Sequence, residues 1–176
     1  RAYVKSISDA IKDKCGVYGL KLPYLVLEPG RSVVGEAGIT LYTVGTVKEI
    51  AGIKTYVAVD GGMFENPRYA LYRADYSALI VDRADENCTQ KVTIAGKCCE
   101  SGDVIAADVN LPQVKRGDVI AVLSTGAYNY SMASNYNRNP IPPVIFVKNG
   151  KAEYVVKPQS YEDIVRNDII PERLKQ

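Results

Sequence analysis

Hydrophobic residues recur every three or four positions near the start of the chain, a spacing that places them on one face of a helix. These apolar positions are Val4, Ile7, Ile11 and Cys15. The pattern predicts a helix through about Lys14, ended by Gly16 and Gly19. The next apolar run, at 24–27, has no polar alternation and is typical of a short buried strand in a parallel sheet.

From Ile39 onward the apolar residues come in short runs separated by Gly, Pro, Asn and Asp. The runs cover 41–47, 55–59, 78–81, 91–95, 104–106, 118–123, 144–147 and 152–156. Asn149-Gly150 between the last two is a hairpin-turn signature. The pattern predicts a mainly β chain with flanking helices, folded as an antiparallel β-barrel or sandwich. We also expect a helix from Tyr128 to about Tyr136, and another from Tyr161 to Ile169 that Ser160 caps.

The helix, short strand and glycine turn at the start resemble the last unit of a β/α barrel. A complete barrel needs roughly 250 residues, and this chain has 176. We therefore expect residues 1–38 to be the final helix–strand–turn unit of a truncated barrel, and residues 39–176 to form a separate β domain.

Composition narrows the possible functions. The net charge is +2, with 24% charged residues and no cluster of Lys or Arg, so we expect no nucleic-acid partner. No apolar run approaches the length of a membrane span, and we expect a cytoplasmic protein without a membrane partner. The four cysteines lack paired metal-ligand spacing, so we expect no metal site. Because histidine is absent, acid–base chemistry must use Cys, Tyr, Lys, Asp or Glu.

Four motifs carry candidate chemistry, and each also has a plain structural interpretation. They are Glu28-Pro29-Gly30-Arg31, Asp60-Gly61-Gly62-Met63 with Asn66-Pro67-Arg68, Cys99-Glu100-Ser101-Gly102-Asp103, and Gly126-Ala127-Tyr128. The plain alternatives are an exposed Glu–Arg turn, an arginine stem covering a tyrosine, an inert packed cysteine beside a solvated glutamate, and a half-buried tyrosine.

The chemical interpretations follow from residue type and spacing. Arg31 can bind a phosphate or carboxylate with two hydrogen bonds. Arg68 and Tyr72, four residues apart, share a face if the segment is helical and could together hold a carboxylate. Cys98 and Cys99 face opposite sides if they lie in a strand, which leaves one to pack and the other accessible.

In this order, from about Leu27 to Tyr136, the motifs resemble the C-terminal part of the diaminopimelate decarboxylases. These enzymes belong to the ornithine/diaminopimelate/arginine decarboxylase family, which depends on pyridoxal 5'-phosphate (PLP). The resemblance covers nearly the whole chain. It implies that residues 1–38 end a PLP-binding α/β barrel and that 39–176 are the C-terminal β domain. It further implies a homodimer with a shared active site.

The resemblance also assigns roles to individual residues. It implies cofactor contacts from Glu28, Pro29, Gly30, Arg31 and Tyr128. It implies substrate contacts from Arg31, Arg68, Tyr72, Glu100 and Tyr128. Cys99 matches the proton donor, which leaves Cys98 to pack. Ornithine and arginine decarboxylases have an aspartate after this cysteine, so Glu100 favours diaminopimelate as the substrate.

The implied reaction converts meso-2,6-diaminopimelate to L-lysine and CO2, the last step of lysine biosynthesis. The lysine to which the family attaches PLP lies early in its barrel, and no lysine here matches that position. We therefore expect this chain alone to be inactive. Two alternatives stay open. One is a non-catalytic decarboxylase-like domain with a binding or regulatory role, and the other is a β-barrel interaction module with an exposed apolar patch.

Overall fold

The computed structural model describes residues 2–175 and divides the chain into two compact units, Arg1–Gly30 and Arg31–Gln176. The first unit contains α1 (Ala2–Tyr18), which confirms the predicted helix. This helix continues through Gly16 and ends where Gly19 adopts a φ of +61° and the Leu20 amide donates to the Cys15 carbonyl at 2.9 Å. The strand predicted at 24–27 is wrong, because a strand requires a paired neighbour and the described part of this unit, residues 2–30, contains only a helix.

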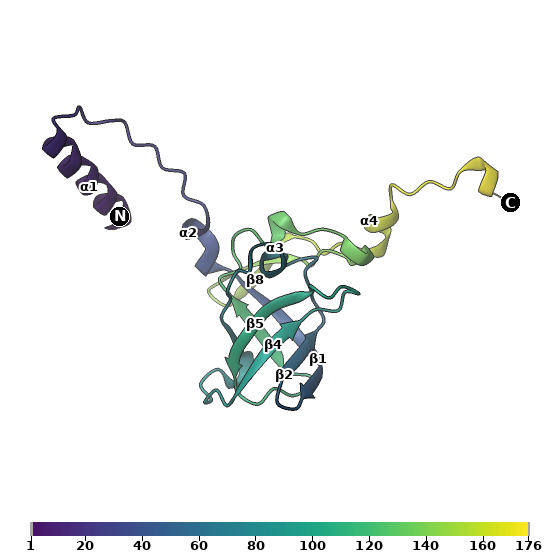
Figure 1. The fold of residues 1–176 in the computed structure, drawn as a ribbon. Coiled ribbons are helices and arrows are strands. Elements are labelled where there is room, and N and C mark those ends of the chain that lie inside the picture. The colour runs from purple at the N-terminus through teal and green to yellow at the C-terminus, as the bar shows by residue number, and fades with distance from the viewer. Residues whose placement is uncertain (1, 176) are drawn as a thin grey trace. The chain divides into compact units, whose positions relative to one another are not determined.

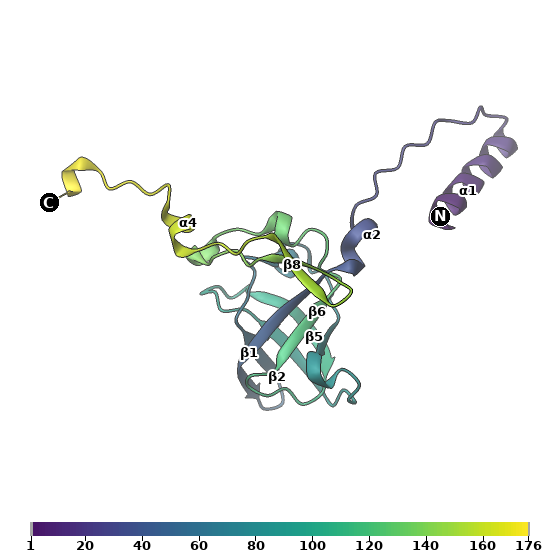
Figure 2. The ribbon, with the colours of Figure 1, turned by 180° about the vertical axis from the view of Figure 1, so that it is seen from behind.

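The second unit is built on a six-stranded sheet. Its strands are β1 (Ile39–Ile50), β2 (Lys54–Val59), β3 (Ala78–Ile80), β4 (Gln90–Ala95), β5 (Val104–Leu111) and β6 (Val119–Leu123). The order across the sheet is β3-β6-β1-β2-β4-β5, and the outer strands β3 and β5 contact each other. The sheet therefore curls into a nearly closed barrel (Figures 1 and 2). The mainly β prediction is confirmed.

Long apolar strands explain how the barrel forms. β1 pairs antiparallel with both β2 and β6, so this one strand joins the two halves of the sheet. The pair β2–β4 is parallel, an exception to the otherwise antiparallel ladders. Side chains of alternate residues point inward and make a closely packed core. Its fully buried members include Val44, Val57, Ile94, Ile105, Leu111 and Ile120.

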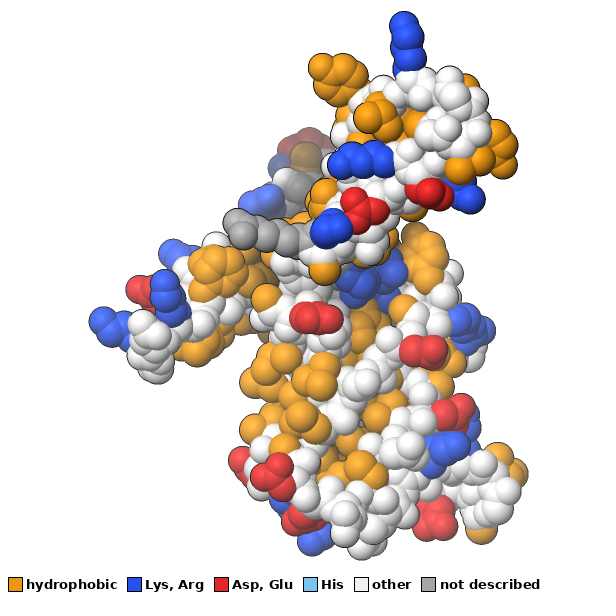
Figure 3. Space-filling view, turned by 90° about the vertical axis from the view of Figure 1, so that its left-hand side faces the viewer, with side chains coloured by type: hydrophobic (Ala, Val, Ile, Leu, Met, Phe, Trp, Pro, Cys, Tyr) orange, Lys and Arg blue, Asp and Glu red, His pale blue; other side chains and the backbone are white. Residues whose placement is uncertain are grey.

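A separate hairpin follows the barrel strands. It consists of β7 (Val144–Lys148) and β8 (Lys151–Val156), as the Asn-Gly signature predicts. Asn149 and Gly150 have φ values of 52° and 73°, the two positive angles that a type I′ turn requires. Hydrophobic side chains gather along this hairpin (Figure 3), and Phe146 and Val147 are exposed.

The helices of the second unit are short. They are α2 (Arg31–Val34), α3 (Arg68–Tyr72) and α4 (Tyr161–Val165). α4 begins as predicted, with a reciprocal capping box between Ser160 and Asp163, but ends four residues early. The helix predicted over 128–136 is wrong: only two 3-10 turns form, at Tyr130–Met132 and Tyr136–Arg138. Asparagine is frequent in this segment, and its side chain competes with helical backbone bonds. Within residues 2–175, no helix is long and apolar enough to span a membrane.

Candidate functional site

Two arginines from different elements share one tyrosine ring. Arg31, which opens α2, has its guanidinium carbon 5.6 Å from the centre of the Tyr128 ring. Arg68, which opens α3, lies 5.5 Å from the same ring and 4.7 Å from the ring of Tyr72. Aromatic faces attract cations, and they also orient the flat guanidinium group. The structure thus brings together four predicted site residues from three distant segments of the sequence.

The two arginines retain hydrogen-bonding capacity. Arg31 donates through Nη1 to the Ser124 carbonyl at 3.1 Å, but its buried Nη2 has no partner among residues 2–175. The buried Nε of Arg68 is likewise without a partner in the described chain. Both side chains line a cavity of about 290 Å³, together with residues 74–77, Leu123 and Ser124. Buried donors without partners carry a free-energy cost that a bound anion would relieve.

Tyr128 is held in an unusual backbone conformation. Its φ is +63°, in the left-handed region that a bulky side chain rarely adopts. The neighbouring Asn129 is buried and stabilises the loop. In the amide orientation that satisfies its surroundings, its Nδ2 donates to the carbonyls of Thr125 and Ala127 at 3.2 and 3.1 Å, and its Oδ1 accepts from Asn66 Nδ2 at 3.2 Å. The loop that carries Tyr128 is therefore fastened to the segment that carries Arg68.

The turn between β4 and β5 carries the candidate acid. β4 ends at Ala95, so Cys98 and Cys99 lie in a bend, and the strand geometry that would point them to opposite sides does not apply. Cys98 is half-buried and its Sγ accepts from Asn139 Nδ2 at 3.6 Å, whereas Cys99 is exposed. Desolvation and the nearby Asp103 carboxylate raise the pKa of Cys98 to about 11. Of the two thiols, Cys99 is the accessible one.

Glu100 is oriented by its own turn. Its Oε1 accepts from the Gly102 amide at 3.1 Å and from the Ser101 hydroxyl at 3.3 Å, and its Oε2 accepts from the Tyr136 hydroxyl at 3.4 Å. The amide of Gly102, followed by the Ser101 hydroxyl, lowers the pKa of Glu100. The side chain is thus an exposed, ionised carboxylate that could receive an amine.

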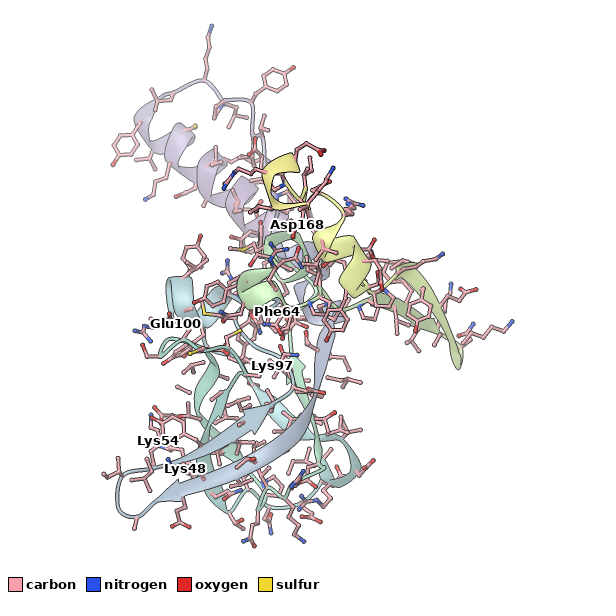
Figure 4. All side chains as sticks on the ribbon, turned by 90° about the vertical axis from the view of Figure 1, so that its right-hand side faces the viewer. Lys48, Lys54, Phe64, Lys97, Glu100 and Asp168 are labelled. Carbon is pink, nitrogen blue, oxygen red and sulfur yellow. The ribbon has the colours of Figure 1, made fainter. Side chains whose placement is uncertain are left out.

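The turn that carries Glu100 adjoins the Gly61-Gly62 loop. The Lys97 amide donates to the Gly61 carbonyl at 3.0 Å, and the Lys97 ammonium lies 5.5 Å from the centre of the Phe64 ring. Figure 4 shows Glu100, Phe64 and Lys97 at one end of the barrel and Lys48 and Lys54 at the other. Glu100 thus lies at the same end of the barrel as Phe64, which follows the Gly61-Gly62 loop.

A buried carboxyl group lies beneath the same loop. Glu65 is 6% exposed, and both its oxygens accept from the Gly62 amide, at 3.2 and 3.1 Å. Burial raises the pKa of Glu65 to about 7. The pKa of the neighbouring Tyr42 is also raised, first by burial and then by the Glu65 charge.

Three predicted cofactor residues belong to the first unit. They are Glu28, Pro29 and Gly30, and all three are exposed. Sequence reasoning also missed three buried polar residues: Asn66, Asn129 and Asp103. Asp103 and Asn66 stand inside the quoted motifs, but a single sequence contains no signal that they are buried.

Comparison with known protein families gives the class to which a chain with this fold and this arginine cluster belongs. A family model described as "Pyridoxal-dependent decarboxylase, C-terminal sheet domain" matches residues 3–126. The chain therefore belongs to this pyridoxal-dependent family, as the motifs imply.

Similar proteins narrow the class further. The chain is 56% identical over 167 residues to the diaminopimelate decarboxylase of Bacillus subtilis, covering 95% of this chain and 38% of that protein. It is 57% identical to the Staphylococcus aureus enzyme of the same name, covering 94% of this chain and 39% of that protein. The structure of the M. jannaschii diaminopimelate decarboxylase in complex with L-lysine matches with a TM-score of 0.83 and 36% identity, covering 95% and 38% of the two chains. This chain thus spans well under half the length of these relatives.

Proposed function

We propose that the protein containing this chain is a PLP-dependent carboxy-lyase that converts meso-2,6-diaminopimelate to L-lysine and CO2. The observation that carries the proposal is a pair of buried arginine nitrogens, Arg31 Nη2 and Arg68 Nε, which have no partner among residues 2–175 and belong to side chains that line one cavity. A site with two such donors suits an anionic ligand. The Bacillus subtilis and Staphylococcus aureus relatives are both named diaminopimelate decarboxylase, and these names support the choice of substrate.

The residues present fit the cofactor that the family uses. PLP carries a phosphate, and Arg31 and Tyr128, with Glu28, Pro29 and Gly30 from the end of the first unit, are the residues that we propose hold it. When bound, PLP accepts the electron pair left by the departing CO2.

Different residues are assigned to the two distal groups of the substrate. We propose that Arg31, Arg68 and Tyr72 bind the distal carboxylate of diaminopimelate, with Tyr128 forming part of the same wall. Glu100 binds the distal amine, because its low pKa keeps it negatively charged where the amine is positively charged. A substrate that lacks either distal group would leave one of these polar groups unpaired, and this disfavours ornithine and arginine.

Cys99 is the proposed proton donor. It is the exposed thiol of the pair, and it is adjacent in sequence to the residue that binds the distal amine. A positioned acid of this kind contributes about 10²- to 10⁴-fold to the rate of proton transfer. We propose that Cys99 and Glu100 act in the active site of the partner subunit of a homodimer in the cytoplasm.

The test is CO2 and lysine release from meso-diaminopimelate by the complete protein with PLP. We expect turnover of diaminopimelate and none of ornithine or arginine. The 176-residue chain assayed in parallel should release no CO2, because no lysine in it matches the position that binds PLP. A complete protein that releases no CO2 from any of these amino acids would overturn the proposed function and favour a binding or regulatory role. An active 176-residue chain would overturn the assignment of the missing lysine.

A further inference from the structure

The most deeply buried carboxylate near the site belongs to Asp103, which is 4% exposed at the start of β5. Its Oδ1 accepts from the Met63 amide and its Oδ2 accepts from the Cys98 amide, each at 2.6 Å. The first amide belongs to the loop that leads into Arg68. The second belongs to the turn that carries Cys99 and Glu100. One carboxylate thus joins the two loops to which the proposed function assigns substrate binding and proton donation.

Two glycines make room for this carboxylate. A Cβ at Gly62 would lie 2.9 Å from both Asp103 oxygens, and a Cβ at Gly96 would lie 2.3 Å from Oδ2. Any side chain at either position would push the carboxylate away from its amides. The absence of a side chain at these two positions therefore leaves room for the Asp103 carboxylate. This accounts for Gly62 of the double glycine, whereas a Cβ at Gly61 would meet the Tyr42 ring at 2.2 Å.

We propose that Asp103 is a positioning residue that fixes the Arg68 loop and the Cys99 turn relative to each other. The inference rests on the proposed function for its catalytic consequence. A carboxylate accepts a hydrogen bond at each oxygen, whereas a carboxamide accepts at only one and presents an N–H group at the other. Asp103→Asn therefore sets a donor against either the Met63 or the Cys98 amide, and one loop is released. Because the proposed function places the Cys99 turn in the active site of the partner subunit, a released loop displaces either the substrate-binding Arg68 in one site or the proton donor in the other. A displacement of about 1 Å at either site can lower the rate by about 100-fold.

The experiment compares Asp103→Asn with Asp118→Asn in the complete protein with PLP. Asp118 is a matched control because its carboxylate also accepts from a turn amide, that of Lys115 at 2.7 Å, and it lies outside the motifs and the cavity. Two measurements are made on each variant: hydrogen exchange at the Met63 and Cys98 amides, and kcat and KM for diaminopimelate per PLP-loaded site.

We expect Asp103→Asn to speed exchange at one or both of these amides by at least about tenfold, which is the loss of about 1.4 kcal/mol of protection. We also expect kcat per loaded site to fall by about 100-fold and KM to rise. Asp118→Asn should leave both measurements unchanged, even where it lowers thermal stability. A purely structural role would lower only the number of loaded sites, and kcat and KM per site would then stay at their wild-type values.

If Asp103→Asn does not fold, Gly62→Ala supplies the second variant, because its methyl group presses on the same carboxylate from the other side. Unchanged amide exchange, or unchanged kcat and KM per loaded site, would overturn the positioning role. An inactive wild-type protein whose two amides still respond to the substitution would overturn the proposed function and leave the link between the loops standing.

Discussion

The guanidinium carbon of Arg68 lies 4.7 Å from the centre of the Tyr72 ring, one helical turn further along α3. This stacking holds the guanidinium plane in a fixed orientation while its buried Nε has no partner among residues 2–175. A cation that is already oriented loses little rotational freedom when it binds an anion. The pair therefore favours a carboxylate that is bound in a defined direction.

Arg68→Lys should raise the KM for diaminopimelate about 10- to 100-fold, because a hydrogen bond to a charged group contributes about 1.5–3 kcal/mol and lysine lacks the planar fork. The measurement is steady-state kinetics of the complete protein. Arg73→Lys is the matched control, since Arg73 also stacks on a tyrosine, Tyr69 at 5.2 Å, but does not line the cavity. Equal KM values for the two variants would contradict the assignment.

Tyr136→Phe should raise the KM for diaminopimelate about two- to tenfold, because it removes one long hydrogen bond, of 3.4 Å, to the proposed amine-binding carboxylate of Glu100. The hydroxyl also helps to lower the pKa of Glu100, so its loss should move the acid limb of the KM profile to higher pH. Tyr130→Phe is the control, because the exposed Tyr130 hydroxyl forms no hydrogen bond within the described chain. An unchanged KM and an unchanged acid limb would show that Tyr136 does not orient Glu100.

The strands of this fold were predictable because each one is a local apolar run bounded by turn residues. The run at 104–106 extends to Leu111 in the structure, since Asn110 still pairs with Lys91 and a register shift around Asp108, whose φ is 55°, does not end the strand. The parallel pairing of β2 with β4 was not predictable, because it depends on which distant edges meet. The failure at 24–27 has the same origin, since a buried-strand pattern describes a strand only where partner strands exist.

The candidate site also combines features that the sequence predicts locally with features that depend on tertiary structure. The i, i+4 spacing of Arg68 and Tyr72 is a local relation, and the structure confirms that they stack. The meeting of Arg31 with Tyr128 joins segments nearly a hundred residues apart. The left-handed backbone of Tyr128 has no local signature in the sequence. The residue types therefore predicted the candidate chemistry. The contacts between the site residues depend on tertiary structure, which one sequence does not reveal.

Cys99→Ala should lower kcat about 10²- to 10⁴-fold, because alanine has no proton to donate and water must replace the thiol. Cys98→Ala is the control, since the Cys98 sulfur is engaged by Asn139 and its pKa is raised to about 11. The control should leave kcat unchanged. The measurement is turnover together with incorporation of solvent deuterium into the lysine product, and wild-type values of both in Cys99→Ala would rule out the assignment.

Glu65 makes a pH-dependent contribution to stability whose sign follows from its burial. Its pKa is about 7 in the folded protein, compared with 4.5 for an ordinary glutamate. The folded state therefore binds a proton more tightly than the unfolded state does. The stabilising contribution of this proton is complete below pH 4.5 and is lost as the pH rises through 7.

Glu65→Gln should remove this dependence, because glutamine keeps the shape and the acceptor for Gly62 but cannot ionise. At pH 8 the variant should be more stable than the wild type by up to about 3 kcal/mol, and at pH 5 the difference should shrink towards zero. The measurement is denaturant unfolding of the complete protein between pH 5 and pH 8. Glu49→Gln, at an exposed position of β1, controls for the loss of a charge. Parallel pH profiles for the wild type and Glu65→Gln would show that Glu65 ionises as readily in the folded protein as in the unfolded chain.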